Sequence, residues 1–331
     1  MNQETIQYVS SVDGTGPLFE DVAFIADGRR KPLVVVMHGY NGQRKAVAQD
    51  IHDLAGRGLF AVAPDMRGRG ESAGRFDSGG LDVHDILDGI LAVISRFPGD
   101  LDEGNINIMG YSGGGANTLA AATRFPDLFQ VGGAFFGISD YGLWYQLNPG
   151  YRAAMDTAVG GSPHTNPLAY AARNACLAAG NNRMTRLHIF WDEEEKSCPP
   201  VMNERFLEAA RAAGATNGVA HVSRVSDAVR WYHGYRTNWP VLAQADDILI
   251  RDITKPVPDL GLPHEGTLTV CGYLVCRHFQ VFVEAGQRGV VTVRYDLSGN
   301  TPRVTVQDNP DNLKVTISLK TPLAVLRGCN Q

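Results

Sequence analysis

The segment Asn-Ile-Asn-Ile-Met-Gly-Tyr-Ser-Gly-Gly-Gly-Ala-Asn-Thr-Leu, residues 105–119, carries most of the structural information in this chain. Its apolar start is typical of a buried strand, and its small residues after Ser112 are typical of the start of a helix. The pattern G-x-S-x-G from Gly110 to Gly114 predicts a sharp turn that exposes the Ser112 hydroxyl. The following helix N-terminus directs its positive dipole toward that hydroxyl. We therefore expect Ser112 to be a nucleophile.

Composition excludes several classes of function. The net charge of −5 and the pI of about 6.0 argue against nucleic acid and anionic membrane surfaces as partners. No apolar run reaches the roughly 18 residues that a membrane span requires. The N-terminus lacks a basic region followed by an apolar core, which predicts a cytoplasmic protein, although a chain trimmed of its signal peptide would look the same.

The cysteines predict neither a disulfide framework nor a metal site. Five is an odd number, so at least one thiol is free or pairs between chains. Cys271 and Cys276 would face opposite sides of one continuous strand. No spacing suggests zinc, and we expect mostly buried thiols in a reducing compartment, with no metal and no cofactor. The five are Cys176, Cys198, Cys271, Cys276 and Cys329.

Strand and helix patterns alternate over residues 1–245, which predicts an α/β domain with a doubly wound, mostly parallel sheet. Strands are expected at 33–37, 60–63, 105–109, 131–137 and 186–191, and helices at 44–57, 82–97, 114–124 and 201–213. Residues 138–185, rich in Tyr, Asn, Pro and Gly, interrupt the alternation. They are either a cap-like insertion over a site or a solvated connection.

Residues 246–331 predict a small all-β domain of the sandwich type. Apolar or alternating stretches at 247–253, 267–275, 278–284, 289–297, 302–307 and 313–319 are separated by turn residues. This domain is expected either to bind a polymeric substrate or to form a homo-oligomer. Its aromatic side chains alternate along the strands, which favours packing in the core over stacking on sugars. They are Tyr273, Phe279, Phe282 and Tyr295.

A serine nucleophile needs a base and an acid that orients the base. On a doubly wound sheet these follow the serine as acid and then histidine. His233, beside a glycine, is the best base, whereas the alternating sequence around His221 predicts a structural histidine in a strand. For the acid, the run Asp192-Glu-Glu-Glu195 after a strand leaves the choice open, with Asp192, Glu194 and Glu195 as candidates.

Two backbone donors are expected to stabilise the oxyanion. One is the N–H of Gly113, directly after the nucleophile, and the other is the N–H of Tyr40 in the loop after the 33–37 strand. His38, at the end of that strand, suits bracing of the loop better than base catalysis. Tyr40, Tyr111 and Trp144 are expected as walls of a substrate pocket.

Four motifs together resemble the α/β-hydrolase fold, in its prolyl oligopeptidase and dienelactone hydrolase branch. They are His38-Gly39, the Asp65-Met-Arg-Gly-Arg-Gly-Glu-Ser72 loop, the Gly110–Gly114 turn and His233-Gly234-Tyr235. The resemblance covers roughly residues 20–240 and not the β domain. Aligning the family's acid loop on Pro199 places Glu195 over its aspartate, so the resemblance implies Glu195 as the acid.

The resemblance and the residues together imply a cofactor-free serine hydrolase that cleaves a small or polymer-linked carboxylic ester. An amide or peptide hydrolase would use the same nucleophile. The family's peptidases carry an N-terminal propeller, for which the roughly 20 residues before the fold are too few. A non-catalytic protein on the same scaffold is the third alternative, against which the intact serine and histidine argue.

Overall fold

The computed structural model describes residues 1–233, 239–255 and 261–326. Its centre is an eight-stranded sheet in the order β1-β2-β4-β3-β5-β6-β7-β8. The first two pairings, β1 with β2 and β2 with β4, are antiparallel, and the other five are parallel. The strands are β1 (Asn2–Tyr8), β2 (Leu18–Phe24), β3 (Lys31–Met37), β4 (Phe60–Pro64), β5 (Leu101–Tyr111), β6 (Val131–Phe135), β7 (Arg186–Asp192) and β8 (Gly218–Ser223).

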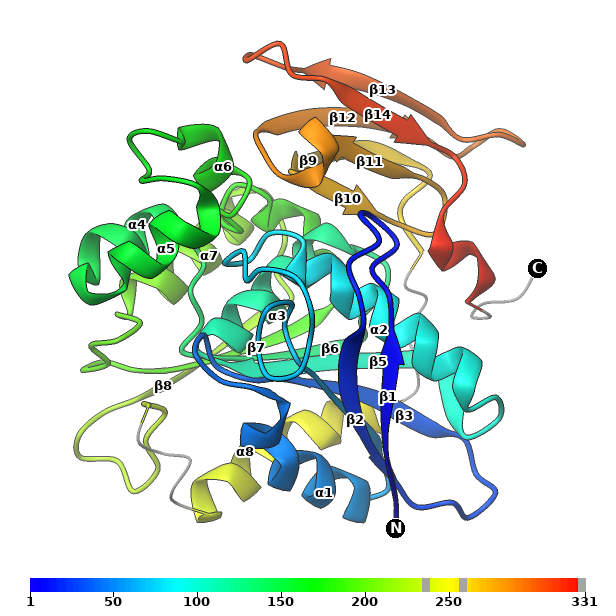
Figure 1. The fold of residues 1–331 in the computed structure, drawn as a ribbon, viewed down its shortest axis with the longest axis vertical. Coiled ribbons are helices and arrows are strands. Elements are labelled where there is room, and N and C mark those ends of the chain that lie inside the picture. Colours follow the sequence, from blue (N-terminus) through cyan, green and yellow to red (C-terminus); the bar gives the residue numbers. More distant parts are fainter. Residues whose placement is uncertain (234–238, 256–260, 327–331) are drawn as a thin grey trace.

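Helices cover both faces of this sheet, as the βα alternation predicts (Figure 1). One face carries α1 (Ala48–Gly56) and α8 (Trp239–Ile253), which are joined by an ion pair between Arg57 and Asp247. The other carries α2 (Asp82–Arg96), α3 (Gly113–Arg124) and α7 (Val201–Ala212). The central strands β4 and β6 are buried along their whole length, because helices shield them from both sides.

Helix α8 corrects the expectation of a strand at residues 247–253. Its inward side chains, Ala245, Leu249 and Ile253, recur every fourth residue and are 1–3% exposed. That is the helical period, so the apolar face packs on the sheet instead of alternating across a strand. Because α8 continues through residues 245 and 246, a domain boundary there would cut a helix that belongs to the α/β unit.

The segment 138–185 folds into the short helices α4 (Tyr141–Leu147), α5 (Arg152–Val159) and α6 (Pro167–Ala171). They lie together at one side of the sheet (Figure 1). Asp140 begins α4 by accepting hydrogen bonds from the N–H groups of Gly142 and Leu143. The role of the segment 138–185 as a cap over the site stays a prediction.

Two three-stranded antiparallel sheets form the C-terminal β domain, in the orders β10-β11-β14 and β13-β12-β9. The expected alternation packs one face of each sheet into a shared apolar core. The aromatic side chains Tyr273, Phe279 and Tyr295 are at most 3% exposed, so they pack inside. The strands are β9 (Glu265–Cys271), β10 (Tyr273–Val275), β11 (Gln280–Val283), β12 (Val290–Asp296), β13 (Arg303–Asp308) and β14 (Val315–Ser318).

Buried polar contacts fix the β domain to the α/β unit. Arg124, the last residue of α3, donates to the Tyr273 hydroxyl at 3.2 Å and to carbonyl oxygens of the 79–80 loop. Asn181 exchanges two hydrogen bonds with the backbone of Thr269 in β9. Such satisfied buried networks hold one relative position because breaking them leaves polar groups without partners.

None of the helices in the described ranges combines the length and the apolar character that a membrane span needs. The four cysteines within those ranges are free thiols, three of them buried. Cys329 lies outside the described residues.

Candidate active site

Ser112 occupies a strained turn between β5 and α3. Its backbone has φ 57° and ψ −112°, a region that non-glycine residues rarely enter. The strand and helix cross so closely that a Cβ at position 114 would lie 2.2 Å from the Met37 carbonyl oxygen. Only glycine fits there. The turn presents the Ser112 side chain at the carboxyl ends of the parallel strands, where clefts of such sheets form.

The two residues expected to donate to the oxyanion lie close together beside this turn. A Cβ on Gly113 would lie 2.6 Å from both the backbone nitrogen and the Cα of Tyr40, so the two backbones are in contact. The N–H of Gly113 belongs to the first turn of α3, where N–H groups have no partner within the helix. The structure thus brings Tyr40 and Gly113 together beside Ser112.

Glu195 is the acid that reaches His233. Its Oε1 lies 2.9 Å from His233 Nδ1, and its Oε2 accepts the backbone N–H of His233 at 2.9 Å. A third bond, from the Ser197 N–H at 2.7 Å, fixes the carboxylate. Burial raises the pKa of Glu195, but the hydrogen bonds and charge of His233 outweigh it and bring the pKa below its ordinary value. The carboxylate is therefore charged at neutral pH.

The two alternative acids point elsewhere. Asp192 is fully buried and binds Arg230 through both oxygens, at 2.7 and 2.8 Å, and it also accepts the Ser223 hydroxyl. Glu194 is exposed, with one oxygen 3.5 Å from Arg230. Asp192 therefore joins β7 to the segment before His233, while Glu195 alone of the three touches the imidazole.

In this structure the Ser112 hydroxyl rests against a thiol. Its Oγ lies 3.8 Å from Cys198 Sγ, and within the described ranges no hydrogen bond joins it to His233. Cys198 is fully buried, which raises the pKa of its thiol well above the ordinary value. Its N–H lies 3.4 Å from Glu195 Oε1. One loop, 195–198, therefore borders both the serine and the acid–histidine pair, and catalytic hydrogen bonds are often loose without substrate.

Tyr111 and Trp144 lie in the core, each 2% exposed, so neither presents a wall to solvent. The Tyr111 hydroxyl donates to Asp50, and the Trp144 indole N–H donates to the Ser197 carbonyl, which braces the acid loop. Trp144 also packs against the Tyr40 ring, with centroids 5.1 Å apart. Gly234 and Tyr235 of the His-Gly-Tyr motif lie outside the described residues.

The other expected histidines have structural surroundings. His38 accepts the Met66 N–H at Nε2 and lies 2.8 Å from the Gly39 carbonyl through Nδ1, so it braces the loop that carries Tyr40. His221 lies in β8 and bonds His188 at 2.9 Å. Cys198 was not foreseen; its one signal in the sequence was its place inside the acid loop. The described residues contain no cluster of three or more His, Cys, Asp or Glu side chains arranged to hold a metal ion.

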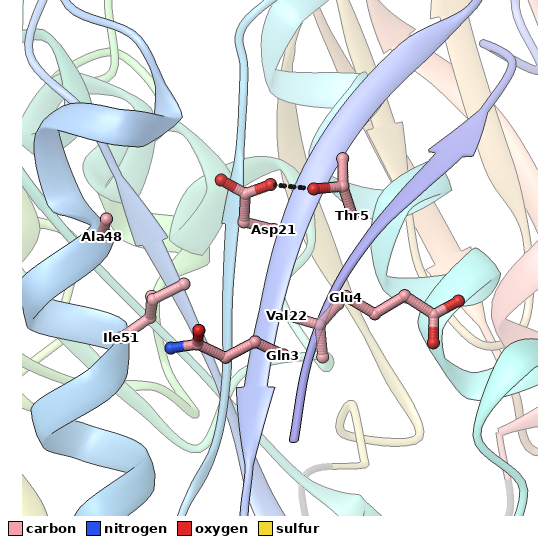
Figure 2. Close-up of a pocket in the computed structure, with 7 residues that line it drawn as sticks. All are labelled: Gln3, Glu4, Thr5, Asp21, Val22, Ala48 and Ile51. Carbon is pink, nitrogen blue, oxygen red and sulfur yellow. Dashed lines mark hydrogen bonds between the residues drawn. The ribbon is translucent and has the colours of Figure 1, made fainter. Parts of the chain in front are cut away.

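Two hollows differ in their relation to these residues. One of about 520 Å³ adjoins the acid–histidine pair and is lined by Glu194, Glu195, Lys196, Arg230, Tyr232 and His233. Figure 2 shows the other, of about 260 Å³, between α1, the edge strand β1 and its neighbour β2. There Thr5 donates to Asp21, and the lining includes none of the candidate catalytic residues.

The sequence model that describes the prolyl oligopeptidase family matches residues 46–224 of this chain. No curated protein matches the chain in sequence.

Solved structures share the fold. An acylaminoacyl peptidase from Pyrococcus horikoshii is 20% identical, with a TM-score of 0.63, over 79% of this chain and 42% of its own. A puromycin-hydrolyzing peptidase from Mycobacterium tuberculosis is 21% identical, with a TM-score of 0.64, over 79% and 40%. An esterase from Pyrococcus furiosus is 15% identical, with a TM-score of 0.56, over 76% and 93%. The aligned part is about two fifths of each peptidase, and at these identities the likeness concerns the fold.

Proposed function

Since this chain belongs to the prolyl oligopeptidase family of serine hydrolases, we propose that it cleaves carboxylic esters through an acyl-enzyme on Ser112. The observation that carries the proposal is the pairing of Glu195 with His233, 2.9 Å apart, beside a serine on a strained turn. A weak nucleophile requires such an oriented base, and a structural role alone gives no reason for the strain.

The proposed mechanism assigns one task to each group. With Glu195 holding the Nδ1–H of His233, Nε2 is left as the acceptor for the serine proton. Ser112 turns from Cys198 toward the imidazole, attacks the carbonyl carbon and forms a tetrahedral intermediate. The N–H groups of Gly113 and Tyr40 stabilise its oxyanion. His233 then protonates the leaving alcohol, and water activated by the same imidazole releases the acid.

Active-site labelling tests this directly. A fluorophosphonate probe should modify Ser112 stoichiometrically, and Ser112→Ala should abolish both labelling and ester turnover while its circular dichroism spectrum and Tm stay those of the wild type. Full esterase activity in that variant would sink the proposal.

A second candidate, amide or peptide hydrolysis, is favoured by the family match and by the two peptidases of similar fold. It differs in the leaving group, because an amine departs only after His233 has protonated it. Matched substrates decide between the two: N-acetylalanine p-nitrophenyl ester and N-acetylalanine p-nitroanilide. We expect the ratio of kcat/KM for the ester to kcat/KM for the anilide to be far larger than the ratio of their uncatalysed hydrolysis rates. Comparable kcat/KM values on both substrates would identify an amidase.

A further inference from the structure

Among the described residues, no carboxylate forms an ion pair with Arg69. Three buried arginines pair with acids: Arg44 with Asp21, Arg67 with Asp85 and Arg173 with Asp77. A fourth, Arg124, donates hydrogen bonds to carbonyl oxygens and to the Tyr273 hydroxyl. Within the described ranges, no carboxylate oxygen lies within 4 Å of the Arg69 guanidinium, and its Nε is buried without a hydrogen-bond partner. A desolvated cation without a partner is costly, so its presence calls for a reason.

The guanidinium lies near the ring of Tyr40, the residue whose backbone N–H is a candidate oxyanion donor. Its Cζ is 4.0 Å from the ring centroid of Phe76 and 5.7 Å from that of Tyr40. The backbone of Tyr40 in turn touches Gly113, the neighbour of the nucleophile. Tyr40 thus lies between the turn of Ser112, where the substrate carbonyl would react, and the guanidinium of Arg69. Cation–π contacts with the rings of Phe76 and Tyr40 hold that guanidinium.

The loop that carries Arg69 is rigidly built. Gly70 has φ 55°, and a Cβ there would lie 2.2 Å from Asp65 Oδ2, so no other residue fits. The Arg69 N–H donates to the Met66 carbonyl, and the Arg69 carbonyl accepts the Ser72 N–H, each at 3.0 Å. A cation held in this way loses little further freedom when it binds an anion.

The surroundings compensate the charge of Arg69 only weakly. Asp82 is the carboxylate whose charge acts on Arg69, but it is 1% exposed, and burial together with the neighbouring Asp77 raises its pKa well above the ordinary value. The raised pKa weakens the negative charge that Asp82 can offer to Arg69. Burial also lowers the pKa of Arg69, as expected of a cation without a partner.

We propose that Arg69 binds a free carboxylate of the substrate, so that the enzyme prefers esters or amides that carry a second, ionised carboxyl group. The planar fork of guanidinium donors matches a carboxylate in two parallel hydrogen bonds. This inference rests on the proposed function of Ser112, because it names the substrate class of the same site.

Substrates that differ in one charge test the preference. The p-nitrophenyl monoesters of succinic, glutaric and adipic acids are compared with the same compounds capped as methyl esters. A fourth pair carries the carboxyl group on the leaving phenol. The wild type should favour the charged member of at least one pair by tenfold or more in kcat/KM. In Arg69→Gln that ratio should fall to about one, and Arg69→Lys should keep part of it. Arg75→Gln, an exposed arginine of the same loop, should keep all of it.

Binding without turnover separates this inference from the proposed chemistry. Calorimetric titration of the Ser112→Ala protein with each pair should show the same charge preference, and Ser112→Ala/Arg69→Gln should lose it. Equal Kd values for charged and capped esters would overturn the carboxylate subsite, even if the wild type hydrolyses both. Charge-selective binding by a protein whose wild type hydrolyses neither would overturn the proposed function and support the subsite.

Discussion

Replacing Glu195 by glutamine changes one oxygen into an NH₂ group at the centre of the proposed triad. The native carboxylate accepts from His233 Nδ1 at 2.9 Å, from the His233 backbone N–H at 2.9 Å and from the Ser197 N–H at 2.7 Å. A glutamine has one acceptor oxygen for these donors. Its NH₂ group must therefore face an N–H donor of His233, unless the imidazole proton moves from Nδ1 to Nε2 and leaves Nδ1 as an acceptor.

That exchange is the physical basis of the expected defect. With the proton on Nε2, the imidazole no longer accepts the proton of Ser112. In the serine protease triad that serves as the general template, the corresponding acid-to-amide change lowers kcat about 10⁴-fold. We expect a loss of about 10³ to 10⁴ for Glu195→Gln, which is roughly 4 to 5.5 kcal/mol of barrier. The lost charge-assisted hydrogen bond should also lower stability by about 2 kcal/mol.

The assay is steady-state hydrolysis of a neutral p-nitrophenyl ester, with urea unfolding in parallel. Asp192→Asn is the matched control, because it removes an equally buried carboxylate that binds Arg230 and not the imidazole. It should lose stability and keep kcat within about tenfold. A larger fall in kcat for Asp192→Asn than for Glu195→Gln would refute the assignment of the acid.

Three further predictions concern buried groups. Burial, and then the charge of Asp21, raise the pKa of Glu20 from 4.5 to about 8, so its favourable contribution to folding is complete below pH 4.5 and is lost as the pH rises to 8. The Tm of Glu20→Gln minus the Tm of the wild type should therefore become more positive from pH 5 to pH 8. A difference that stays constant over this pH range would contradict the prediction. Gly114→Ala should cost about 3 kcal/mol or more in urea unfolding, whereas Gly150→Ala, where a Cβ meets open space, should cost under about 0.5. Iodoacetamide should spare Cys198 in the folded protein and label it after unfolding, as read by mass spectrometry; rapid native labelling would contradict the burial of its thiol.

Local sequence patterns were sufficient to predict helices, strands and turns where one physical effect dominates. The Gly110–Gly114 turn, the buried run at 33–37 and the apolar or alternating stretches after residue 277 predicted elements that the structure contains. The expected stretch 267–275 was wrong as one strand, because Gly272, with φ 74°, divides it into β9 and β10, which belong to different sheets. Helix α8 was missed because Ile248, Leu249 and Ile250 resemble a buried strand over a short window. The four-residue spacing of Ala245, Leu249 and Ile253 is the signal that would have identified it.

The site was predictable in its types of residue and less so in its contacts. Spacing alone left three carboxylates open after β7, and only the resemblance singled out Glu195. No sequence rule distinguishes a carboxylate that turns toward Arg230 from one that turns toward His233, because both follow the same strand. The contact of Cys198 with Ser112 and the unpaired charge of Arg69 depend on loops that meet only in the folded chain.

Helix α3 connects two parts of the molecule that would otherwise seem independent. It starts beside the nucleophile and ends at Arg124, whose guanidinium donates to the Tyr273 hydroxyl of the β domain and to carbonyl oxygens of the 79–80 loop. Twelve residues make a rod about 18 Å long. One helix thus joins the serine turn to a hydrogen bond with the β domain. The C-terminal strands thus help to hold the helix that carries the serine turn, and they are not an independent accessory domain.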